Sequence, residues 1–302
     1  MNLVKHRNIF FLISAIVIIP GMLAVIFFGL KMSIEFTGGS ELEMNIPSVN
    51  MSRVKQVIES DNVKVHTVSM TGNNILVRTE PLSQDQKKKV VASVEKVYPK
   101  AKEKSFETIG PTIGKETGIN ALKAVVVASI AITLYIAFAF RKVSEPVSSW
   151  KYGVCAIAAL LHDVLVVIGI FAILGYLFNV EIDSLFITAL LTIMGFSVHD
   201  TIVVFDRIRE NLRKNYSQKF EDVVNKSLLE TMNRSVNTSL TVLLVLFALL
   251  IFGGDSIRWF VVALLAGIIS GTYSSIFNAS QLLVVWYEFD KKRKLKAPHS
   301  KK

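Results

Sequence analysis

Residues Ser184 to Phe205 read SLFITALLTIMGFSVHDTIVVF, and ionisable side chains interrupt this apolar stretch only at His199 and Asp200. A helix needs about 20 mostly apolar residues to cross the hydrocarbon core of a bilayer. The stretch meets that requirement, so the sequence predicts a transmembrane helix here. The same helix would place a carboxylate inside the membrane.

Five more apolar runs of similar length predict five more spans: Ile9 to Leu30, Ala121 to Phe140, Tyr152 to Val180, Ser235 to Gly254 and Trp259 to Tyr287. Hydrophobic residues make up 51% of the chain and charged residues only 19%, against about a quarter charged in soluble proteins. This composition excludes a soluble enzyme. The first run is too long for a signal peptide and no small-residue cleavage site follows it, so we expect an uncleaved anchor.

The distribution of positive charge predicts the orientation. Lysines and arginines precede the first run, follow the sixth and crowd the connection between the fourth and fifth, whereas 179–183 contains none. Positive residues favour the cytoplasmic side, so we expect both termini in the cytoplasm and a multi-pass membrane protein. The expected division is a first transmembrane helix (1–30), an extracytoplasmic domain (31–117), a five-helix transmembrane region (118–290) and a basic tail (291–302).

The net charge of +10 also raises the possibility of nucleic-acid binding. No aromatic-studded basic groove accompanies the charge, and the cations flank apolar runs as expected beside anionic membrane lipid. We therefore expect no nucleic-acid partner. The outer segment carries no metal-ligand spacing and no nucleophile motif, so we also expect no cofactor and no enzymatic catalysis.

The outer segment alternates between strand and helix patterns. The predicted strands are 35–46, 63–70, 75–79 and 104–109, and the predicted helices are 52–60 and 83–98. This β-α-β-β-α-β order is that of a ferredoxin-like α+β domain. The predicted fold class is thus an all-α membrane bundle of six transmembrane helices with one ferredoxin-like domain.

Three ionisable residues lie deep in the predicted spans: Asp163, Asp200 and Arg234. Each costs at least about 2.5 to 3.5 kcal/mol at the bilayer centre. Asp200 and Arg234 lie at comparable depths on consecutive, antiparallel helices, so they are candidates to meet. Arg234 shares one helix face with Asn237, Thr238 and Thr241 at helical spacing.

Two interpretations of this pair stay open. It is either a structural ion pair or part of a proton path, in which the carboxylate takes up a proton when the guanidinium moves away. Asp163 also has two interpretations, as a member of that path or as a buried neutral acid. The adjacent histidines, His162 and His199, are more typical of packing or hydrogen bonding than of a proton relay.

Small polar residues of the sixth span (Gly267, Gly271, Ser275, Ser270, Ser274 and Asn278) are typical of close helix packing.

Four stretches together resemble the SecF members of the SecD/SecF family of protein-export membrane proteins, in the RND superfamily. They are GFSVHDTIVVFDRIRENLRK (195–214), EFTGG (35–39), TIGPTIGKE (108–116) and NRSVNTSLT (233–241). The resemblance implies half of an RND-type unit in the plasma membrane of a bacterial cell, with SecD supplying the other half. It also implies work with the Sec channel SecYEG and the motor SecA on unfolded exported polypeptides.

In that family the residues corresponding to Asp200 and Arg234 are the functional pair, and the resemblance implies that an aspartate of SecD completes the site. The domain-entrance motif is Glu35, Phe36, Thr37, Gly38 and Gly39. The chain departs from the family at Glu35, which replaces aspartate, and at His199, which replaces asparagine. A titratable His199 makes it a candidate modulator with Asn237 and Thr238, and leaves sodium as the alternative to the proton. A stand-alone RND-like exporter and a non-transporting scaffold are the competing functions.

Overall fold

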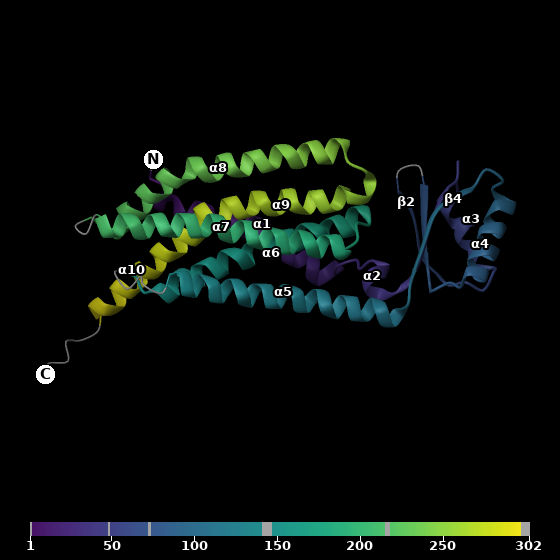
Figure 1. Cartoon of the computed structure of the whole chain (residues 1–302), viewed down its shortest axis with the longest axis horizontal. Coiled ribbons are helices and arrows are strands. Elements are labelled where there is room, and N and C mark those ends of the chain that lie inside the picture. The colour runs from purple at the N-terminus through teal and green to yellow at the C-terminus, as the bar shows by residue number, and fades with distance from the viewer. Residues whose placement is uncertain (1, 48, 72–73, 141–146, 215–217, 297–302) are drawn as a thin grey trace. The chain divides into compact units, whose positions relative to one another are not determined.

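A computed structural model describes residues 2–47, 49–71, 74–140, 147–214 and 218–296 (Figure 1). The chain divides into two compact units. The membrane unit comprises Met1–Leu30, Val125–Val180 and Leu185–Lys302, and the outer unit comprises Lys31–Ala124 and Glu181–Ser184. The predicted 31–117 domain lies inside the outer unit, which extends further along the chain and adds the short 181–184 segment.

Six helices among the described residues are long and apolar enough to cross a membrane, which confirms the predicted number of spans. They are α1 (Arg7–Phe28), α5 (Pro111–Ala139), α6 (Ser149–Phe178), α7 (Ser184–Lys214), α8 (Phe220–Phe252) and the α9 (Arg258–Ser274) to α10 (Ser280–Lys296) segment. The α9–α10 segment is one continuous span because a single π-helical turn, Ser275–Ala279, joins its two halves. Of the predicted basic tail, residues 297–302 lie outside the described residues.

Several spans extend beyond their predicted limits, and the longest extensions are those of α5, which begins at Pro111 rather than Ala121, and of α7 and α8. The 206–214 stretch is the end of α7, and α8 begins at Phe220 rather than Ser235. Charged residues of the α7 extension pair at helical spacing, as Arg209 does with Asp206. Apolar residues of the α7 and α8 extensions also bury against each other, with Ile208 and Val224 fully buried in one core.

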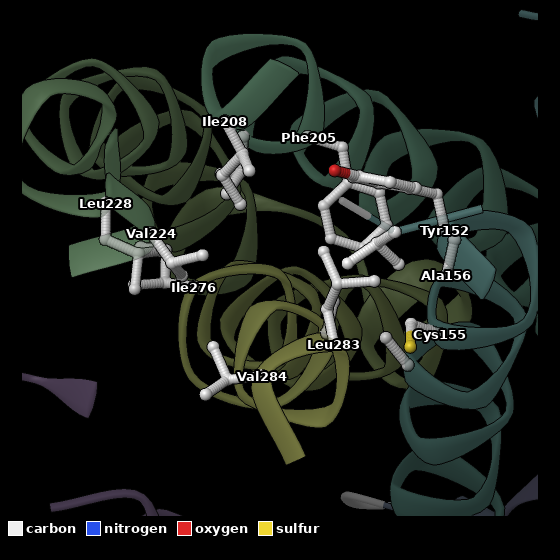
Figure 2. Close-up of a cluster of buried hydrophobic side chains, with 14 of the residues drawn as sticks. Tyr152, Cys155, Ala156, Phe205, Ile208, Val224, Leu228, Ile276, Leu283 and Val284 are labelled. Atoms are coloured by element: carbon white, nitrogen blue, oxygen red, sulfur yellow. The ribbon is translucent and has the colours of Figure 1, made fainter. Parts of the chain in front are cut away.

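The core of the membrane unit lies between α6, α7, α8 and α10, as Figure 2 shows. The Tyr152 and Phe205 rings meet edge to face with centroids 5.2 Å apart. Leu283 of α10 lies in the same cluster, and Cys155 is buried beside it. Buried apolar residues of these four helices thus pack together in one core.

The outer unit has a four-stranded antiparallel sheet in the order β2-β3-β1-β4. Its strands are β1 (Gly39–Asn45), β2 (Val65–Thr71), β3 (Asn74–Thr79) and β4 (Lys102–Ile109), and its helices α3 (Met51–Glu59) and α4 (Gln84–Val97). Apolar residues of both helices and of the sheet form one core. This confirms the ferredoxin-like prediction.

One predicted strand is partly wrong. Residues 35–38 belong to a helical turn, α2 (Ile34–Thr37), and to its end rather than to the strand. Ser33 caps this turn by accepting a hydrogen bond from the Glu35 backbone N–H, and Gly38 ends it with a φ of 75°. Only glycine adopts that conformation freely, so the glycine pair redirects the chain into β1.

Candidate functional site in the membrane helices

Asp163 is completely buried on α6 and accepts hydrogen bonds on both carboxylate oxygens. Ser270 donates to Oδ1 at 2.7 Å. Ser197 and Ser274 donate to Oδ2 at 2.6 and 2.7 Å. Three serine hydroxyls from two other helices therefore surround this carboxylate, which offsets part of the cost of burying it.

The sequence interpretation missed this cage, since it treated the small residues of the sixth span as packing. They do pack: a Cβ added at Gly271 would lie 3.0 Å from Cβ of Ser197. Close approach of α9 to α7 is what brings the hydroxyls to Asp163. A search for serines at helical spacing opposite a membrane aspartate would have found Ser270 and Ser274.

His162 extends the cage toward α1. Its Nδ1 lies 3.0 Å from Oδ1 of Asp163, and its Nε2 lies 3.0 Å from Oγ of Ser14. Ser14 in turn contacts the side-chain amide of Asn278, which lies in the π-helical turn. Such turns are frequent at functional sites. The result is a chain of hydrogen-bonded side chains through α6, α1 and the sixth span.

Asp200 on α7 is also buried, with 3% of its surface exposed. Its Oδ2 atom is buried and has no hydrogen-bond partner within the part of the chain that the structure describes. His199 Nδ1 lies 3.9 Å from Oδ1, beyond hydrogen-bond range, and its side chain is 66% exposed. Asp200 therefore differs from Asp163: one of its oxygens is unsatisfied.

Arg234 is not brought into direct contact with Asp200. No ion pair joins the two among the described residues, although the Arg234 charge acts electrostatically on the carboxylate. Arg234 is exposed on α8, as are Asn237, Thr238 and Thr241 of the same face. We call these four residues the α8 stripe. The stripe faces away from its own chain, so a direct Asp200–Arg234 contact stays a prediction.

The entrance motif lies in the outer unit, against the start of α5. A Cβ added at Gly38 would lie 2.6 Å from Cα of Pro111, so no larger residue fits there. Phe36 lies beside Gly118, and Thr37 donates to the Ser33 carbonyl at 3.0 Å. Gly39 has a φ of 132°, which favours glycine.

The carboxylate of Glu35 reaches the 181–184 segment of the same unit. Its Oε2 accepts a 2.7 Å hydrogen bond from the backbone N–H of Ser184, the first residue of α7. Ile182 pairs with the chain beside Met32 in a parallel bridge, and Glu181 forms an ion pair with Arg78. The helix that carries Asp200 thus begins from a segment held within the outer unit.

The site has no metal-binding arrangement in the described ranges, where no group of three or more His, Cys, Asp or Glu side chains gathers. What it offers instead is two buried carboxylates, a histidine with 11% of its side chain exposed and an exposed arginine. Carboxylates and imidazoles are able to take up and release protons within a membrane, and the arginine, which stays charged, is able to act as their counter-charge.

Comparisons with known proteins agree on one family. A family model described as "Protein export membrane protein SecD/SecF, C-terminal" matches residues 89–289. A SecF protein translocase subunit of Thermobaculum terrenum is 47% identical, covering 96% of this chain and 95% of its own. The SecF of Anaerolinea thermophila is 44% identical, covering 95% of this chain and 94% of its own.

A solved structure shares the fold. The crystal structure of SecDF, a translocon-associated membrane protein from Thermus thermophilus, superposes with a TM-score of 0.84 at 34% identity. The match covers 95% of this chain and 39% of that one. Identity this high over nearly the full length shows descent as well as a shared fold, so the chain is a multi-pass membrane protein that belongs to the SecF subunits of the SecD/SecF family.

Proposed function

We propose that this chain is an accessory subunit of the Sec protein-export machinery, which works with SecD to couple the transmembrane proton gradient to late steps of translocation. The observation that carries the proposal is Asp200, a buried membrane carboxylate with an unsatisfied oxygen. The names of the relatives, protein translocase subunits, support the export role. The coupling involves no covalent catalysis and no cofactor.

The partnership with SecD follows from fused relatives. SecDF proteins of Bacillus subtilis and Thermus thermophilus are each 37% identical to this chain, which covers 37% and 35% of their lengths. The rest of such a chain is a natural partner for this one. The α8 stripe supports the proposal because an exposed arginine at membrane depth needs a partner with a complementary charge. An acidic residue on a SecD helix fits that requirement.

The proton step uses the separation of Asp200 from Arg234. When Arg234 approaches, the carboxylate is ionised and paired; when Arg234 turns to SecD, Oδ2 of Asp200 takes up a proton. Asp163 belongs to the same path from the neighbouring helix α6, and His199, Asn237 and Thr238 modulate the step. Sodium stays the alternative coupling ion that the family resemblance leaves open.

Movement reaches the exported polypeptide through the outer unit. Helix α7 carries Asp200 and starts at Ser184, where Glu35 holds its first residue. A shift of α7 therefore displaces a segment bound within the outer unit. Arg7 at the start of α1 pairs with Glu288 near the end of α10 at 2.7 Å, which supports an arrangement with both chain ends on one side, the cytoplasm. The outer unit then faces the extracytoplasmic side, where polypeptides that the motor SecA drives into the channel emerge from SecYEG.

The test is an export assay in inverted membrane vesicles containing SecYEG, SecA and SecD, with and without a proton gradient. Asp200→Asn keeps the side-chain shape and removes titration, so we expect it to abolish the gradient-dependent increment. Asp206→Asn on the same helix is the matched control, since Asp206 is exposed and paired with Arg209. An unchanged increment in Asp200→Asn, with SecD still copurifying, would leave a structural scaffold as the better description.

A further inference from the structure

His162 has a hydrogen-bond partner on each ring nitrogen. Only 11% of its side chain is exposed and none of Asp163. Asp163 receives serine hydroxyls on both oxygens. The imidazole Nδ1 completes this set as an N–H donor at 3.0 Å. The tautomer of His162 is thereby set, and Nε2 is the atom at which its protonation changes.

The surroundings of Nε2 match both protonation states. In the neutral ring, Nε2 accepts from the Ser14 hydroxyl at 3.0 Å. Ser14 then accepts from Nδ2 of Asn278 at 2.9 Å. In the charged ring, Nε2–H donates to Ser14, whose hydroxyl hydrogen turns to Oδ1 of Asn278 at 3.1 Å.

Both amide atoms of Asn278 lie within hydrogen-bond distance of the same hydroxyl. Nε2 of His162 and the Ser14 hydroxyl therefore keep hydrogen-bond partners in both protonation states, and only Oδ1 of Asn278 gives up its hydrogen bond when the ring is neutral. Burying a polar group without a partner is costly, and a histidine with a purely structural role needs partners for only one state. Partners for Nε2 and for the Ser14 hydroxyl in both protonation states distinguish His162 from a histidine that only packs.

We propose that His162 is a proton-binding residue of the coupling cycle, a role that rests on the proposed function above. A proton delivered from water by the gradient binds the lone pair of Nε2, and the Ser14 hydroxyl hydrogen turns toward Asn278. The Asp163 carboxylate balances the new charge. Release reverses these movements. Asp163 is then the fixed partner of the proton site, and His162 is the group that changes protonation.

The other groups around the imidazole are consistent with this role. The titratable side chains packed against His162 in the described residues are Asp163 from its own helix and Tyr273 from α9. The Tyr273 ring stacks at 6.2 Å between centroids and donates its hydroxyl to the Phe10 carbonyl. Helix α1 contributes the neutral Ser14, and the π-helical turn the neutral Asn278. Asp163 is therefore the counter-charge that the structure provides.

The first measurement is direct and does not depend on export. The full chain, purified with SecD and containing isotope-labelled histidine, is titrated by NMR from pH about 8 to about 5, around the usual histidine value. The chain has five histidines; signals lost in His162→Gln identify His162, and those lost in His66→Gln identify an exposed control. We expect His162 to gain a second ring proton as the pH is lowered. A ring that keeps a single proton throughout overturns the proposal.

The second measurement asks whether that proton is used. His162→Gln is expected to lose the gradient-dependent increment of export while still copurifying with SecD, and His66→Gln to keep it. Asn278→Ala removes the acceptor that Ser14 needs only when His162 is charged, so a smaller fraction of His162 carries two ring protons at a given pH. The Asn278→Ala variant also keeps the proposal testable if His162→Gln does not fold.

A gradient-dependent increment of export that survives in both His162→Gln and Asn278→Ala contradicts the proposal. If wild-type export itself ignores the gradient, the proposed function fails instead, and the NMR titration still decides whether His162 binds a proton.

Discussion

Oε2 of Glu35 accepts a 2.7 Å hydrogen bond from the backbone N–H of Ser184, the first residue of α7. The first backbone N–H groups of a helix have no partner inside the helix, and a carboxylate there also interacts favourably with the helix dipole. The entrance motif and the helix that carries Asp200 therefore meet in one interaction.

This contact predicts a loss of stability in Glu35→Ala. Removing an acidic cap costs about 0.5 to 2 kcal/mol, so the melting temperature of the full chain in detergent should fall. Glu116→Ala is the control, because Glu116 is exposed near the start of α5, where substitutions usually change stability by less than about 0.5 kcal/mol. Equal melting temperatures for the two variants would argue against a capping role.

The Asp163 cage predicts that Asp163→Leu is strongly destabilising. The substitution leaves the hydroxyls of Ser197, Ser270 and Ser274 without their acceptor, and each unsatisfied buried group costs about 1 to 3 kcal/mol. Ser274→Ala, which also removes a donor to Asp163, should cost less. Thermal aggregation of the chain in detergent, followed by size-exclusion chromatography, measures both. The reverse order of stability would contradict the cage.

The crossing of α1 and α6 predicts opposite effects for two glycines of one helix. A Cβ at Gly169 would lie 2.6 Å from Cα of Gly21 in the α1 backbone, so Gly169→Ala forces the helices apart. Gly153 has nothing within 4 Å of its added Cβ, and Gly153→Ala should be neutral or stabilising by up to about 1 kcal/mol. Melting temperatures of the two variants test this, and a tolerated Gly169→Ala would show that the crossing is looser than described.

Glu43 on β1 predicts a pH dependence in the outer unit. Burial raises the pKa of Glu43, but hydrogen bonds from Lys104, Asn74 and Ser105 outweigh burial, and the net pKa is lowered. A lowered folded pKa gives stability that is present above the unfolded value of about 4.3 and is lost as pH falls through the folded pKa.

The test compares Glu43→Gln with the wild type. The variant should be less stable than the wild type near neutral pH, and the difference in melting temperature should shrink under acidic conditions. Lys104→Met keeps the carboxylate but removes the cation that pairs with it at 3.1 Å, so it should weaken the pH dependence. A difference that does not change with pH would contradict the assignment to Glu43.

Much of the architecture follows from the sequence because it depends on local properties. The apolar character of a span is a sum over about 20 neighbouring residues, and all six predicted spans are present. Alternation and helical spacing likewise determined the order of elements in the ferredoxin-like domain. The burial of Asp163 and Asp200 was predictable from their depth in the runs, since both lie far from the ends of their helices.

The tertiary structure alone decided which groups meet. Asp163 takes its donors from positions 34, 107 and 111 residues away, and no local pattern fixes the rotation that aims those serines at it. Arg234 shares a helical face with polar residues, as predicted, but only the packing of α8 turns that face outward. Helix rotation and close approach depend on contacts such as Gly21 with Gly169 and Gly271 with Ser197. These contacts join residues distant in the chain, so the sequence determined the spans and the fold determined the site.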